Sequence, residues 1–113
     1  MTTVRDMVGA IQMEVLKSDD LLPQRASELL MTATALIGNV NHEIREADAL
    51  YNLVLLDCLQ TEEKANRARI VAETTPAYAR RREARDTLTL LTELIRSLKV
   101  FIKAQGEEMR LSR

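Results

Sequence analysis

The fold is decided by the segment ASELLMTATALIGNVNHEIREADALYNLVLLDCLQT, residues 26–61. Apolar residues recur in it at alternating spacings of four and three, at Ala26, Leu30, Ala33, Ile37, Val40, Ile44, Ala47, Tyr51, Val54 and Cys58. The repeat continues through Thr61, Ala65, Ala68 and Ala72, and the polar Thr61 is its one interruption. Such a heptad repeat is typical of helices that pack along an apolar seam. We therefore predict one long helix over residues 24–74.

Two prolines mark where further helices begin. Pro23 and Pro76 each suit the first turn of a helix, where the missing N–H would have no partner. Thr75 is placed to be the N-cap of the last helix through its hydroxyl group. We expect a first helix near residues 3–17 and a last helix near 76–109, with a second seam at Ala84, Leu88, Leu91, Ile95, Leu98 and Ile102.

Two seams of equal period predict an antiparallel hairpin that turns around residues 74–76. The last helix then ends near Ile44, and the pairs along the hairpin are Ala84–Ala68, Leu91–Thr61, Leu98–Val54 and Ile102–Tyr51. The first helix folds back over residues 24–43. Gly38 is a weak point of the long helix, because glycine costs about 1 kcal/mol relative to alanine in a helix interior. A break there would instead give a compact four-helix bundle.

The composition supports an all-α fold. The 113 residues include three Gly, two Pro, two Tyr and one Phe, which leaves little material for turns or strands. A content of 46% hydrophobic and 29% charged residues suits a folded domain. We predict a single helical domain, residues 1–113, built as a long antiparallel helical hairpin or coiled coil with a short N-terminal helix folded back, three to four helices in all.

The stretch ALYNLVLLDCLQ, residues 49–60, has leucines all around the predicted helix. A helix that is apolar on every side is expected to be buried on every side. In the hairpin this requires a partner chain, so we predict self-association through Leu50, Leu53, Leu55, Leu56 and Leu59. In the compact bundle the same leucines would fill an intramolecular core.

Opposite charges gather in two neighbouring blocks, although the net charge is only −1. Residues 43–63 contain six acidic residues against Arg45, and residues 64–85 contain seven basic residues against two acidic ones. In the predicted hairpin the basic block surrounds the turn. It predicts a nucleic-acid-binding tip formed by Lys64, Arg67, Arg69, Tyr78, Arg80, Arg81, Arg82 and Arg85.

Three interpretations of this basic block remain open. Arginine side chains suit phosphate contacts, and Tyr78 is placed to stack on an exposed base. Alternatively, the arginines simply solvate a long helix, since arginine is a good helix former. In the third interpretation, the basic tip of one chain meets the acidic block of another and sets the register of an oligomer.

The sequence contains no catalytic or cofactor motif. His42 opens the run HEIRE, but position 46 is Glu rather than the second histidine of a zinc site. Cys58 lies on the seam and suits a small core residue better than a nucleophile. We expect no enzyme, no metal, no cofactor and no small-molecule substrate. No run of uncharged apolar residues is long enough to span a membrane, so we expect an intracellular, cytoplasmic protein.

The run EKANRARIVAETTPAYARRREARD, followed by ELIRSLKVFIKAQGEEMR, resembles small helical proteins encoded by tailed phages. Such proteins are often encoded beside recombination or replication genes. The resemblance implies single-stranded DNA or a DNA-processing protein as a partner, and the host cytoplasm as the location.

Together these observations favour a non-enzymatic, self-associating protein that assists phage recombination or replication and binds nucleic acid at its basic tip. The alternatives are a protein–protein adaptor or inhibitor that binds through an apolar or acidic helical face, and a purely structural coiled coil.

Overall fold

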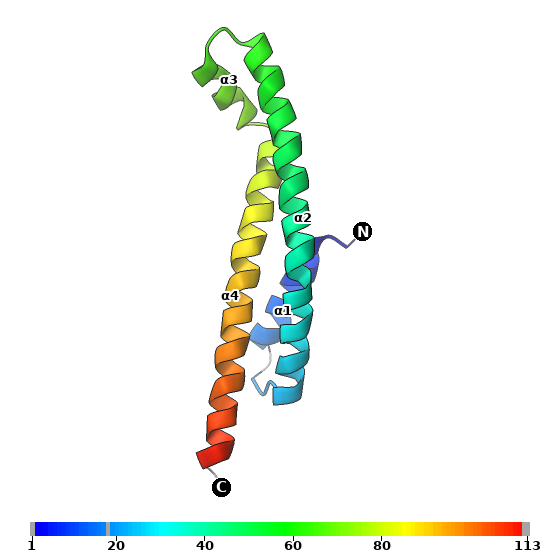
Figure 1. The fold of residues 1–113 in the computed structure, drawn as a ribbon, viewed down its shortest axis with the longest axis vertical. Helices are drawn as coiled ribbons and strands as arrows, with labels where there is room; N and C mark the ends of the chain where they lie inside the picture. The colour runs from blue at the N-terminus through cyan, green and yellow to red at the C-terminus, as the bar shows by residue number, and fades with distance from the viewer. Residues whose placement is uncertain (1, 18, 112–113) are drawn as a thin grey trace.

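The computed structural model describes residues 2–17 and 19–111, and these residues form four α-helices and no strand. The helices are α1 (Val4–Lys17), α2 (Pro23–Thr61), α3 (Ala65–Ala72) and α4 (Pro76–Leu111). They make a rod of 72 × 27 × 22 Å in which α2 and α4 run side by side (Figure 1). The predicted all-α fold, a long antiparallel hairpin with a short N-terminal helix folded back, is confirmed.

Both prolines begin helices, as the sequence predicted. α2 starts at Pro23 and α4 at Pro76. The hydroxyl of Thr75 accepts a hydrogen bond of 3.4 Å from the backbone N–H of Tyr78, as expected for an N-cap. α2 passes through Gly38 without a break, so the compact four-helix bundle does not form.

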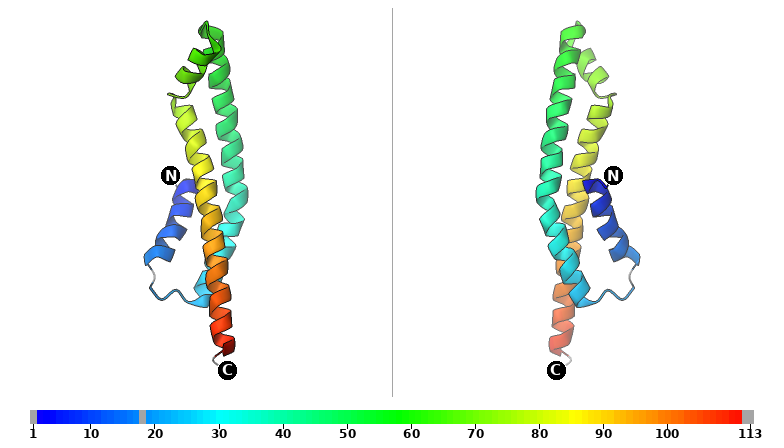
Figure 2. Two further views of the ribbon diagram at one scale, coloured as in Figure 1. Left: turned by 90° about the vertical axis from the view of Figure 1, so that its left-hand side faces the viewer. Right: turned by 90° about the vertical axis from the view of Figure 1, so that its right-hand side faces the viewer.

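α1 lies against the lower parts of α2 and α4 and makes that half of the rod three helices thick (Figure 2). Its N-terminus is capped reciprocally, because the N–H of Asp6 donates to the Thr3 hydroxyl and the N–H of Thr3 donates to the Asp6 carboxylate. These bonds hold the pKa of Asp6 below its ordinary value. Arg25 joins α2 to α1 by a 2.7 Å bond to Glu14. The predicted fold-back over residues 24–43 is confirmed.

The chain reverses at residues 62–64, not around residues 74–76 as predicted. The hydroxyl of Thr61 donates to the carbonyl of Cys58 at 3.2 Å, and Glu62 is extended with φ −102° and ψ 141°. α3 then folds back and packs Ala68 against Tyr51 and Cys58. The predicted helix over 24–74 is wrong because Thr61, the polar position of its seam, ends a helix instead of filling a buried layer.

This different turn moves α4 along α2. Tyr78 packs on Tyr51, Arg80 bonds to Glu43, and the Gln105 amide reaches the carbonyl of Leu21. α4 therefore runs past the start of α2 rather than ending near Ile44. The predicted register is wrong in all four of its pairs, Ala84–Ala68, Leu91–Thr61, Leu98–Val54 and Ile102–Tyr51.

The main core lies between α1, α2 and α4. Its largest fully buried side chains are those of Leu91, Leu98, Val8 and Val40. α1 covers only one side of the α2–α4 pair. Residues on that side are therefore more deeply buried than residues at several positions of the predicted seam. The buried positions there include Leu29, Leu36, Thr87 and Leu94, whereas Leu30, Ile37, Leu88 and Ile95 are only partly buried.

Candidate functional site

Arg80 joins the two long helices. Its guanidinium donates to both carboxylate oxygens of Glu43, at 2.7 and 3.1 Å, and lies 3.5 Å from Glu46. The side chains of Arg80 and Glu43 are 40% and 33% exposed. The hydrogen bonds from Arg80 lower the pKa of the Glu43 carboxyl and raise that of the guanidinium. Two parallel bonds between planar groups make this a geometrically specific ion pair.

Arg81 and Arg85, about one turn apart on α4, make a second cross-helix cluster. Arg81 donates to Asp48 at 3.1 Å, and Arg85 lies 3.3 Å from the same carboxylate. The Arg81 guanidinium also sits 4.8 Å from the ring centroid of Tyr51. The ring of Tyr78 packs on that of Tyr51, with centroids 5.5 Å apart and planes tilted by 49°. The ring of Tyr78 is thus already packed against another ring within the protein.

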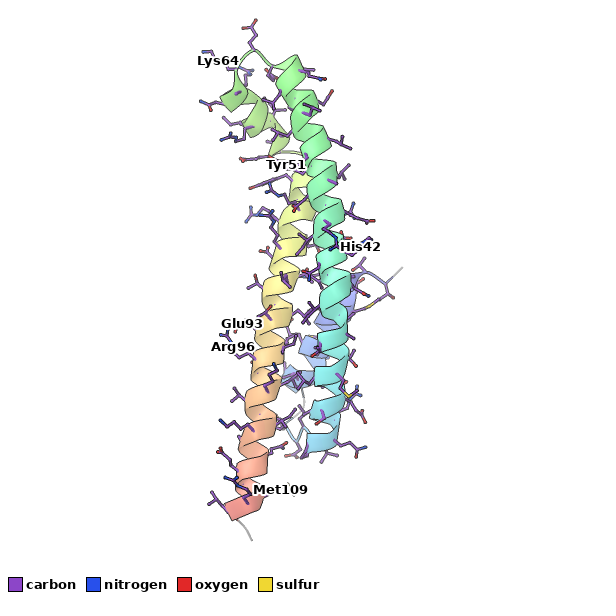
Figure 3. The ribbon with its side chains drawn as sticks, viewed as in Figure 1. His42, Tyr51, Lys64, Glu93, Arg96 and Met109 are labelled. Carbon is purple, nitrogen blue, oxygen red and sulfur yellow. The ribbon has the colours of Figure 1, made fainter. Side chains whose placement is uncertain are left out.

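The predicted nucleic-acid-binding residues do not gather at one tip. Lys64, Arg67 and Arg69 lie at the hairpin end or on α3, and Figure 3 shows Lys64 there, well beyond Tyr51 along the rod. Arg67 is 3.4 Å from Glu62. Within the part of the chain that the structure describes, Lys64, Arg69 and Arg82 are exposed and make no ion pair. Of the seven basic residues, four therefore form ion pairs with described carboxylates and three form none.

The leucines of α2 form an exposed apolar surface near the hairpin end. Leu50, Leu53, Leu56 and Leu59 are 40%, 66%, 54% and 44% exposed, and we call these four the α2 leucine face. Leu55 is different, because it packs against the small core formed by Tyr51, Cys58 and α3. α3 and α4 lie on the same side of upper α2, and its other side is uncovered (Figures 1 and 2).

A cavity of about 420 Å³ opens where the N-terminus of α1 meets α2 and α4. Its apolar walls include Val4, Val40 and Ala84. Its arginines are already engaged, since Arg5 donates to the Thr87 hydroxyl at 3.2 Å and Arg80 donates to Glu43. The cavity marks the point where the three-helix half of the rod gives way to two helices.

The remaining candidate residues show no grouping suited to chemistry. His42 lies 3.0 Å from Glu46 on an exposed helix surface, and Cys58 is buried. Among residues 2–17 and 19–111, no three His, Cys, Asp or Glu side chains are close enough to share a metal ion. No helix in these ranges has an apolar stretch long enough to cross a bilayer.

Sequence reasoning missed the partners of the arginines. Within one chain, Arg80 contacts Glu43, and Arg81 and Arg85 contact Asp48. Arg81 also packs on the ring of Tyr51. The third interpretation of the basic block placed such pairs between two chains instead. The adjacent blocks of opposite charge were the signal for this pairing. Comparisons of the chain with protein-family models, with curated proteins and with solved structures gave no match.

Proposed function

We propose that this chain is a non-enzymatic, self-associating helical protein whose α2 leucine face is the contact surface. The observation that carries the proposal is the exposure of Leu53 and Leu56 on the outer side of α2, with Leu50 and Leu59 exposed to either side of them. Contiguous exposed apolar patches on soluble proteins mark interaction sites.

The charges of the rod support this choice over a phosphate-binding function for α4. Arg80, Arg81 and Arg85 each already bond to a carboxylate on α2. A phosphate group would have to displace those carboxylates, and each exposed ion pair lost in this way costs up to about 1 kcal/mol of the binding free energy. A protein that binds the exposed leucines of α2 would break no such ion pair.

Light scattering after size-exclusion chromatography tests the proposal. Wild-type protein is expected to show a mass above that of one chain at tens of micromolar, and the double variant Leu53→Ser, Leu56→Ser is expected to be monomeric. Val100→Ser is the matched control, because Val100 is similarly exposed but lies on α4. Circular dichroism checks that all variants stay helical. A wild-type monomer at every concentration, or an unchanged mass in the double variant, contradicts the proposal.

Nucleic-acid binding at the hairpin end is a second candidate function, favoured by the exposed cations Lys64 and Arg69. Binding of a labelled single-stranded oligonucleotide, measured by fluorescence anisotropy, should weaken steeply as salt rises if these side chains contact phosphates. Lys64→Glu with Arg69→Glu should abolish it, whereas Lys99→Glu with Lys103→Glu, at the other end of the rod, should have a smaller effect. Equal losses in the two double variants would argue for nonspecific attraction along the rod.

A further inference from the structure

We infer that the turn at residues 62–64 is a hinge, and that opening it joins α2 and α3 into one continuous helix. Two open chains then exchange their α3–α4 segments, so that each α4 packs on the α2 of the other chain. The partner is a second copy of this chain, because another copy offers the same surface of α2 that α3 and α4 cover in the closed form. The exchange does not use the α2 leucine face and goes beyond the proposed function.

The three residues of the turn favour helices. Glu62, Glu63 and Lys64 include no glycine or proline, and glutamate and lysine are good helix formers. Glu62 is extended with φ −102° and ψ 141°, and Lys64 is extended with φ −114° and ψ 133°. Backbone rotation within these three residues therefore converts the turn into a continuous helix.

The closed turn leaves backbone N–H groups without helical partners. Lys64 supplies no side-chain cap to α3, and no N–H of residues 63–67 donates to a described backbone carbonyl. In a continuous helix each of these groups donates to the carbonyl four residues earlier. The bonds at the two helix ends, from Glu62 to Cys58 and from Ala68 to Lys64, already have that spacing and are kept. Opening therefore adds backbone hydrogen bonds in both chains.

The apolar seam runs through the turn without a change of spacing. Its positions are symmetric about Glu63 and form three pairs: Thr61 with Ala65, Cys58 with Ala68, and Val54 with Ala72. In the closed form Cys58, Ala68 and Ala72 belong to one buried cluster, with Val54 packed against it. Two continuous helices that cross antiparallel at Glu63 form the same layers between chains. The swapped dimer thus reuses the contacts of the closed chain.

Each half of the swapped dimer repeats the closed rod. It contains α1 and α2 of one chain with α3 and α4 of the other, so the ion pair between Arg80 and Glu43 forms between chains. The hinge lies at the end of the rod, away from α1 and the C-terminus (Figure 1). A second rod can therefore extend from that end without overlap. Two rods of 72 Å joined end to end give a particle about 140 Å long.

Salt should shift the balance towards the swapped dimer. The ion pair between Arg67 and Glu62 spans the closed turn at 3.4 Å, but the Arg67 side chain is 76% exposed, and exposed pairs contribute little. Near the two-fold axis of the dimer, Glu62 and Lys64 lie beside the same residues of the other chain, and these like charges favour the closed form. Salt screens both effects.

Refolding at different protein concentrations tests the inference. The chain carries Leu53→Ser and Leu56→Ser, which remove contact through the leucine face, and is diluted from urea into high salt. Glu43→Cys and Arg80→Cys, in a Cys58→Ala background, are then joined by a short bismaleimide, since the side chains they replace bond at 2.7 Å. The closed monomer gives a cross-link within one chain. The swapped dimer gives a cross-link between two chains on a denaturing gel.

Ala65→Pro distinguishes the two forms. Ala65 is the first residue of α3, where proline loses no hydrogen bond, and Lys64 before it already has the extended angles that a following proline requires. In the continuous helix the same proline is interior and breaks the helix. Ala65→Pro should raise the protein concentration needed for half-dimer at least about 100-fold. The milder Glu63→Gly should raise it about 10-fold, and the control Glu93→Gly, which is helical in both forms, should leave it unchanged.

Each outcome decides the inference. A dimer with cross-links between chains, lost in Ala65→Pro, supports it. Cross-links that all stay within one chain, equal dimer fractions in the parent and the hinge variants, or a monomer at every refolding concentration overturn it. Circular dichroism checks folding, and Glu63→Gly decides if Ala65→Pro does not fold. The proposed function fails separately, when native wild-type protein is monomeric or when Leu53→Ser with Leu56→Ser leaves its mass unchanged.

Discussion

The ion pair between Arg80 and Glu43 gives the sharpest quantitative prediction. The perturbation is a double-mutant cycle with Arg80→Ala, Glu43→Ala and the two combined. Exposed ion pairs contribute about 0.2–1 kcal/mol, and two-bond geometry with side chains 40% and 33% exposed places this pair at the upper end. We expect a coupling free energy of about 1 kcal/mol, screened by salt.

The matched control is Arg82→Ala, two residues along α4, since Arg82 is exposed and makes no ion pair with any described residue. It should change the free energy of unfolding by less than about 0.5 kcal/mol. The assay is urea unfolding followed by circular dichroism, at a concentration where all variants have the same mass by light scattering. A coupling energy below about 0.3 kcal/mol, or an equal cost for Arg80→Ala and Arg82→Ala, would refute the cross-helix role.

Three further predictions concern stability. Gly38→Ala should raise the free energy of unfolding by about 0.5–1 kcal/mol in urea titrations, because Gly38 is inside α2 and a β-carbon there meets nothing within 4 Å; a loss would mean that glycine is required. Leu91→Ala should cost about 2–5 kcal/mol in the same assay, whereas Leu111→Ala, at an exposed helix end, should cost far less. The pKa of Glu43 is lowered in the folded state, so its ion pair contributes above the ordinary carboxyl pKa and is lost as pH falls through the folded value. Glu43→Gln should therefore lose less stability than wild type between neutral pH and pH values near about 3, and equal losses would contradict that assignment.

The helix starts and the seam could be predicted from the sequence because each has a local chemical cause. Pro23 and Pro76 suit a first helical turn and no later one, and Thr75 supplies the cap. The seven-residue spacing of small apolar residues defines one face of α2 regardless of what packs on it: Ala26, Ala33, Val40 and Ala47 are buried, and Val54, the next in the series, is partly buried. These features depend only on neighbouring residues, so a single sequence is enough to locate them.

The chain reversal could not be predicted in the same way. α2 ends at Thr61 without glycine or proline, and Thr61, Ala65, Ala68 and Ala72 keep the heptad spacing across the turn. The pattern is the same for one continuous helix and for two helices that fold back on one another. Only packing of α3 on Tyr51 distinguishes them.

The error in the turn carried over to the candidate site. With the reversal at residues 74–76, Arg80 and Arg81 lay at a tip, far from Glu43 and Asp48, and a ligand or a second chain was needed to satisfy them. With the reversal at residues 62–64, the same residues meet within one chain. The leucines of residues 49–60 were hard to assign for another reason. The sequence does not show whether a leucine is buried by its own chain or by a second chain.

Detachment of the short helix α3 from α2 can be measured in the native protein, because a cysteine lies beneath α3. α3 has eight residues, lies between two turns and buries only Ala68 and Ala72, so it can open without disturbing the α2–α4 core. Cys58 lies beneath it and is 8% exposed. Because only an exposed thiolate reacts quickly, the rate at which a thiol reagent modifies Cys58 measures how often α3 detaches. In the native protein, the rate of Cys58 modification thus reports opening of the hairpin end separately from global unfolding.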